Sequence, residues 1–472
     1  MAKTTSKTTA TTWEKRYDTA SSNQTKMFKR FSNWYDSLYA VVGVVPSPWR
    51  SKMYVPVLAR QTWALVSKFL AIKPVFQVKV ATPQQSEEDI DTKAEKARRM
   101  LEYDYENPYM EESMRDKLFA PLLDATVCGT GMAKVVWRVE NRVSYSRNTD
   151  RDGNVDLTQE SKTTRKVAYN DLEPVNIFNV FVSPSAKNLY GAPWIIIKDF
   201  VPLQHLRDVN DANGVKIYNN LDQLDGTTSY DDDMNSYNIS RNRLTSQQNR
   251  QDSTVDMVKI FECYEGKTIS TYAENQGEKS DEAEGSWVLL RQQVNPYWHG
   301  KYPLVKFVVK SKPFQFWGEG LFETTYRLQA GYNDVFNHFL DQWNLSENSM
   351  LIANERNGIN DYVIEPGGVI TYRGDVPPTQ FKHAAPDHNN LSTILTYMDQ
   401  AIEGVTISQY AAGNPNSATD KTKGTATGIE HLQSAAGDVV SFMRNNFTQS
   451  VTQIGRMWLS NRQQYATETI DC

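Results

Sequence analysis

Residues 303–348 read PLVKFVVKSKPFQFWGEGLFETTYRLQAGYNDVFNHFLDQWNLSEN. The first part of this stretch predicts a strand that ends at Pro313, and a long helix follows Gly318-Glu319-Gly320. In the second part apolar residues recur at intervals of three, four and seven, so they lie on one stripe of the helix. At about 1.5 Å per residue the helix would be about 43 Å long. A helix of that length with a single apolar stripe needs partner helices.

A second apolar stripe, at 391–412, supplies such a partner. The residues between the two helices, 349–390, predict short strands and turns in MLIAN, VITYR and TQFKH. A polar, turn-rich segment follows at 413–424, and a very long amphipathic helix occupies most of 425–472. The side chains expected to pack in the helix pair are Leu328, Tyr332, Val335, Phe339, Ile394, Met398 and Ile402.

The chain before this region alternates between helical and strand patterns, so the predicted fold class is α+β. Residues 26–318 form the mixed part, with a helix at 110–128 and a hairpin of strands at 132–145 and 163–169. An excursion near 224–255 lacks apolar periodicity and predicts a mobile surface segment. Residues 1–25 are rich in Thr, Ser and Lys, which indicates a flexible N-terminal arm.

Composition bounds the function. The 472 residues carry a formal net charge of -5, which argues against a protein that coats nucleic acid. Aromatic residues make up 11% of the chain, a content that fits contacts between subunits. Three cysteines, Cys128, Cys263 and Cys472, fit a reducing compartment. The N-terminus lacks the apolar core of a signal peptide and no run of eighteen apolar residues occurs, so we expect a protein made in a cytoplasm without a membrane span.

Catalytic motifs are weak throughout. The turn Gly129-Thr130-Gly131 is too short for a dinucleotide fingerprint, and GNPNSATDKT at 413–422 lacks the GK[ST] ending of a phosphate loop. The six histidines are not spaced as metal ligands. Two acidic clusters, at 150–156 and at Asp231-Asp232-Asp233, leave a metal-dependent nuclease as a distant alternative. The sequence therefore predicts no enzyme, no cofactor and no metal.

Four motifs, in this order of elements, resemble the portal protein of a tailed bacteriophage of podovirus type. They are NPYWHGKYPLVKF at 295–307, WGEGLFETTYRLQAGYNDVFNHFLDQ at 317–342, EPGGVI at 365–370 and GTATGIEHLQSAAG at 424–437. The resemblance extends from about residue 30 to about residue 465. It implies a wing at 26–318, stem helices at 319–348 and 391–412, and a clip at 349–390. It also implies a tunnel loop at 413–424 and a wing or crown helix at 425–472.

The resemblance implies a homo-dodecameric ring in the virion, at the one capsid vertex through which double-stranded DNA enters and leaves. Its expected partners are the major capsid protein, the terminase ATPase and then a neck or tail adaptor. Within the tunnel loop, Lys421 and Lys423 are expected to touch phosphates without reading sequence. The acidic side chains Glu323 and Asp341 lie off the apolar stripe and are expected to face the channel and repel DNA weakly. A head-tail adaptor, which would also oligomerise, is the alternative.

Overall fold

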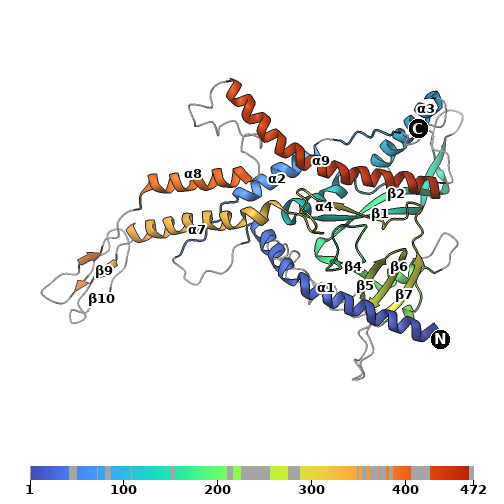
Figure 1. Cartoon of the computed structure of the whole chain (residues 1–472), viewed down its shortest axis with the longest axis horizontal. Helices are drawn as coiled ribbons and strands as arrows, with labels where there is room; N and C mark the ends of the chain where they lie inside the picture. Colours follow the sequence, from blue (N-terminus) through green and yellow to red (C-terminus); the bar gives the residue numbers. More distant parts are fainter. Residues whose placement is uncertain are drawn as a thin grey trace.

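The structure is a computed structural model of the whole chain. It describes residues 2–41, 50–71, 73–79, 87–107, 109–149, 155–209, 216–224, 256–274, 287–347, 350–352, 359–361, 371–372, 379–381, 386–405 and 426–466. Helices and strands are mixed in a broad body, and a pair of long helices projects from one side of it (Figure 1). The mixed α+β class expected from the sequence is confirmed.

Four helices begin the chain. They are α1 (Ala2–Leu38), α2 (Val57–Leu70), α3 (Glu87–Tyr105) and α4 (Met114–Cys128). Ser113 caps the start of α4 by accepting a hydrogen bond from the Asp116 amide. Gly129 ends α4 in the left-handed conformation, with φ of 88°, which glycine adopts without strain.

The flexible arm expected over residues 1–25 is instead the first part of the 37-residue helix α1. Its Thr, Ser and Lys content resembles that of a linker, yet Trp13, Tyr17, Ala20 and Gln24 follow at helical intervals on the face toward the body. The Tyr17 ring lies 4.7 Å from that of Phe181. Burial of this aromatic stripe, rather than local propensity, orders the segment.

Two sheets form the body. The first has the order β2-β1-β8 and the second has the order β3-β4-β5-β6-β7, both antiparallel. The strands are β1 (Gly131–Thr149), β2 (Val155–Val175), β3 (Val180–Val182), β4 (Trp194–Pro202), β5 (Met257–Glu265), β6 (Thr268–Glu274), β7 (Trp287–Val294) and β8 (Leu304–Phe307). Short helices at Ile177–Asn179, Leu203–Asp208 and Leu221–Gln223 connect them. The hairpin of β1 and β2 is longer than its sequence pattern predicts.

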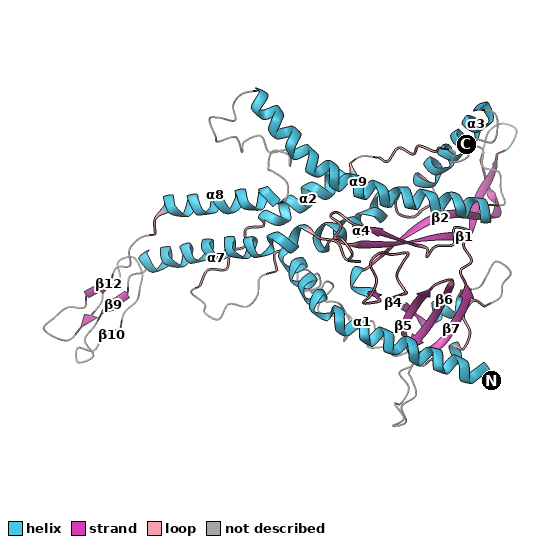
Figure 2. Cartoon of the chain, in the orientation of Figure 1, coloured by secondary structure: helices cyan, strands magenta, loops and turns pink. Residues whose placement is uncertain are grey.

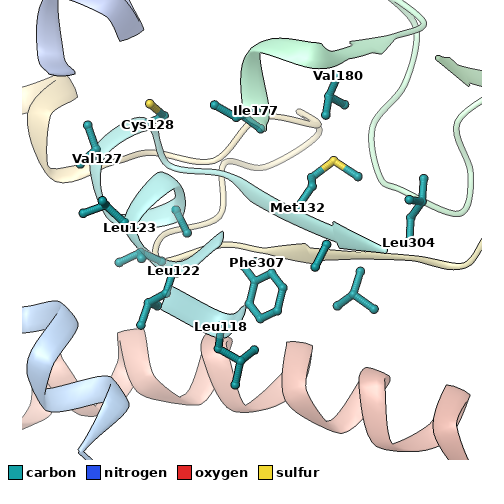
Figure 3. Packing of buried hydrophobic residues seen from close by; sticks show 14 of the residues in the cluster. Leu118, Leu122, Leu123, Val127, Cys128, Met132, Ile177, Val180, Leu304 and Phe307 are labelled. Atoms are coloured by element: carbon teal, nitrogen blue, oxygen red, sulfur yellow. The ribbon is translucent and has the colours of Figure 1, made fainter. Parts of the chain in front are cut away.

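The core lies where α4 crosses β1 and β8. Figure 3 shows Leu118, Leu122, Met132 and Phe307 converging there, all of them buried. The long helix α9 (Ala426–Tyr465) runs beneath this cluster, and its Ser450 hydroxyl donates to the Lys306 carbonyl at 2.8 Å. The core therefore joins the middle of the chain to its last helix.

The projecting pair consists of α7 (Leu321–Glu347) and α8 (His388–Val405). Four short strands lie at its far end: β9 (Met350–Ile352), β10 (Ile359–Asp361), β11 (Thr371–Tyr372) and β12 (Thr379–Phe381). β9 pairs with β12 and β10 pairs with β11, so one small hairpin lies inside the other in chain order (Figure 2). Three of the four strands fall within the MLIAN, VITYR and TQFKH segments.

Candidate functional site: the projecting helix pair and its base

The two projecting helices lie side by side and run in opposite directions, away from the body and back (Figure 1). α7 occupies 321–347, where the sequence predicts a helix over 319–348, and α8 occupies 388–405 of the region around 391–412. We call α7 and α8 the stem. The inner part of the stem packs against the helices of the body, and further out the described contacts of the stem are those between α7 and α8 and those of α7 with residues 51–55.

The base of the stem is held by two glycine-rich turns pressed backbone to backbone. The turn at 129–131, after α4, meets the turn at 318–320, before α7, and the Gly318 amide donates to the Thr130 hydroxyl at 2.8 Å. A Cβ atom added at Gly320 would lie 2.1 Å from the Val127 carbonyl oxygen. Only glycine permits this approach, which fixes where α7 leaves the core.

A polar ladder then runs along one side of α7. Its four rungs are Gln329, Asn333, Asn337 and Asp341, spaced four residues apart. They accept hydrogen bonds from the backbone amides of Leu58, Val55, Met53 and Ser51, in that order, at 2.9, 2.9, 2.8 and 2.6 Å.

The register of the polar ladder follows from elementary geometry. Four helical residues rise about 6 Å, and two extended residues span about 6.6 Å, so rungs on α7 meet every second amide of residues 51–55. Gln329 and Asn337 also donate to the carbonyls of Val55 and Met53. The extended segment thus satisfies its backbone on side chains instead of a neighbouring strand.

The residues expected to pack in the stem divide into an inner and an outer group. Tyr332 and Ile402 are buried, and Leu328 and Met398 are partly buried against the main core. Further out, the Phe339 ring lies 5.1 Å from the ring of His388 on α8. The other two members are less covered: Val335 is half-buried and Ile394 is exposed.

The acidic side chains Glu323, Asp341 and Asp399 of the stem interact with groups of the same subunit. Glu323 accepts from the Lys312 ammonium at 2.6 and 2.7 Å, and Asp341 is the outermost rung of the polar ladder. On α8, burial raises the pKa of Asp399, while the positive charge of Arg60 opposes that rise. Both acidic residues expected to face a channel therefore have partners within their own subunit.

Other predicted sites fall outside the described residues. Lys421 and Lys423 lie there, as do Asp231-Asp232-Asp233 and most of the acidic cluster at 150–156. In the described part of the chain, His, Cys, Asp and Glu residues form no group of three that could hold a metal ion. None of the helices in these described ranges combines the length and the apolar character that crossing a bilayer requires.

A sequence profile of one protein family, the phage SU10 portal protein, matches residues 77–471. The match covers far more than half of the chain and includes the stem, the strands at its end and α9. The chain belongs to the phage portal protein family. No curated protein matches it.

The match favours a portal protein over a head-tail adaptor, and the family is structural rather than enzymatic. α1 and α2 lie before the matched residues of this portal protein. Two of its features escaped sequence analysis. The packing of α1 was signalled by the helical spacing of Trp13, Tyr17 and Ala20. The polar ladder was signalled by amide residues four apart on α7, although nothing in the sequence identified residues 51–55 as their partner.

Proposed function

We propose that twelve copies of this portal protein form a ring at the capsid vertex, with the stems side by side in the wall of a DNA channel. The observation that supports this proposal most directly is the apolar surface that the outer stem exposes in the single subunit. Trp343 is 40% exposed, Ile394 43% and Tyr397 68%. Contacts of one type, repeated head to tail, close into a ring when the rotation per subunit divides the circle.

A two-residue substitution tests the role of the stem. Ile394→Asp with Tyr397→Asp places charges where we expect a neighbouring subunit to pack, and both sites are exposed in the monomer. The variant should keep the thermal unfolding midpoint of the wild-type monomer but lose rings in electron micrographs. Rings that form as readily as those of the wild type would exclude the outer stem from the interface.

The remaining parts of the ring have different partners in this proposal. The body, including residues 26–318, meets the major capsid protein. The strands of 349–390 form the clip, which docks the terminase ATPase during packaging and a neck or tail adaptor afterwards. The energy for translocation comes from that ATPase. The subunits assemble in the host cytoplasm and remain in the virion.

Double-stranded DNA passes through the channel without sequence recognition. Each phosphate that a protein neutralises adds salt-dependent affinity, so a wall with few basic groups lets DNA slide. Lys421 and Lys423, in the segment between the stem and α9, are the proposed backbone contacts. Glu323 and Asp341 are proposed to keep the wall mildly acidic, although local partners weaken their field.

The two lysines can be tested in packaging reactions. Lys421→Ala with Lys423→Ala should lower the packaging rate, the packaged DNA length or the retention of DNA, because two phosphate contacts per subunit are lost. The matched control is Lys26→Ala with Lys29→Ala, which removes the same charge from exposed positions on α1. Unchanged values for all three quantities would show that Lys421 and Lys423 do not contact DNA.

A further inference from the structure

The outer part of the β1–β2 hairpin is a two-stranded ribbon that runs past the end of α9 (Figure 2). β8 pairs with Gly131–Lys134 of β1, and among the described strands no third one pairs with the hairpin beyond that point. α9 ends against the ribbon, where the Tyr465 ring stacks on Trp137 at 5.9 Å. A ribbon of two strands is marginally stable alone, so further contacts would stabilise this one.

Beyond Trp137, the described residues leave side chains on one face of the ribbon exposed. Successive side chains of a strand alternate between faces, so Val139, Val143 and Tyr145 lie on the face that α9 covers further in. All three are exposed, Tyr145 by 66%. Lys162 is paired with Tyr145 across the hairpin, and Lys166 with Asn141. We call this surface the lysine face.

The lysine face has no charge partner in the part of the chain that the structure describes. Both lysines are exposed, and no ion pair involves either of them among the described residues. Val139, Val143 and Tyr145 beside them form an apolar stripe. An apolar stripe flanked by two unpaired ammonium groups fits a protein surface that carries carboxylates.

A short turn with two exposed carboxylates lies on the opposite side of the ribbon. Arg142 projects from the other face, donates to the Tyr109 carbonyl, and places its guanidinium 5.5 Å from the Tyr109 ring centre. The segment that follows, Met110 to Glu112, leads into α4, and Glu111 and Glu112 are both exposed. We call residues 109–112 the glutamate turn. Among the described residues its two carboxylates also make no ion pair.

The geometry points to a contact between neighbouring copies of this chain, in which the lysine face of one subunit binds the glutamate turn of the next. This inference rests on the proposed ring. In a head-to-tail ring each subunit presents two different surfaces to its two neighbours. Here the two surfaces carry opposite charge and lie on opposite sides of one ribbon, so a single repeated contact pairs them and covers the apolar stripe.

Charge exchange tests the pairing. Lys162→Glu with Lys166→Glu, and separately Glu111→Lys with Glu112→Lys, should each raise the subunit concentration needed for half-assembly at least about tenfold, as measured by mass photometry at low salt. Combining all four substitutions should restore assembly, because the pairing is then reversed in sign but intact. Lys26→Glu with Lys29→Glu on α1 changes the charge equally and should leave assembly unchanged. Circular dichroism checks that each variant is folded.

The outcomes separate this contact from the proposed ring. Rings from both two-site variants at the wild-type concentration would overturn the contact and leave the ring intact. Two disrupted variants that the four-site variant fails to restore would show that the surfaces do not pair. Loss of DNA packaging in the lysine variant alone, with assembly unchanged, would assign the lysine face to DNA and overturn the contact. A wild-type chain that forms no rings would contradict the proposed function itself.

Discussion

At the scale of single residues, the charge of Asp341 has a specific structural use. Its position in the sequence lies off the apolar stripe of α7, and the resemblance to portal proteins predicts that it faces a channel. In the structure its carboxylate ends the polar ladder by accepting from the Ser51 amide at 2.6 Å. The sequence shows which side chains are polar, but not which backbone segment, almost three hundred residues away, comes to rest against them.

Two substitutions at Asp341 separate its hydrogen bond from its charge. Asp341→Ala should lower the free energy of unfolding by about 1 kcal/mol, because the Ser51 amide loses its acceptor. Asp341→Asn keeps an acceptor oxygen and should unfold like the wild type in urea. Asp334, exposed on the same helix, gives the control: Asp334→Ala should change little. A packaging defect in Asp341→Asn, with wild-type stability, would show that the charge of Asp341 acts mainly on DNA in the channel.

At the scale of elements, the sequence predicts helices and strands well where the apolar residues follow a single helical or strand periodicity. The stripe from Leu321 to Trp343 predicted α7 within a few residues, and the strand pattern after Gly131 predicted β1. Prediction failed for α1, because a composition rich in Thr and Ser masked the spacing of its buried residues. The meeting of the two glycine turns was also beyond prediction, since each turn alone is a common loop signal.

Paired glycine substitutions test the base of the stem. Gly320→Ala should destabilise the protein by at least about 2 kcal/mol, because the added methyl group meets the Val127 carbonyl oxygen, which is backbone and cannot rotate away. Gly331→Ala, eleven residues further along α7, meets only the end of the Met398 side chain at 3.9 Å. It should stabilise the helix by about 0.5–1 kcal/mol.

Urea unfolding of the isolated subunit measures both glycine variants. The order of stability should be Gly331→Ala, then wild type, then Gly320→Ala. Equal stability of Gly320→Ala and the wild type would mean that the two turns separate at little cost. The stem would then not be fixed to the core by this contact.

At the scale of the whole molecule, the subunit has features expected of one member of an oligomer. Its body holds a continuous core of helices and two sheets, whereas its stem extends beyond that core with apolar side chains exposed. Buried cysteines, Cys128 and Cys263, belong to the body. The body is therefore expected to fold alone, and the outer stem is expected to gain its cover on assembly.

Electron microscopy of the purified wild-type protein, combined with mass photometry, tests the ring most directly. The account predicts closed rings with a central hole wide enough for duplex DNA and a mass near twelve times 53.9 kDa. Species that remain monomers or dimers, even with the capsid protein present, would contradict it.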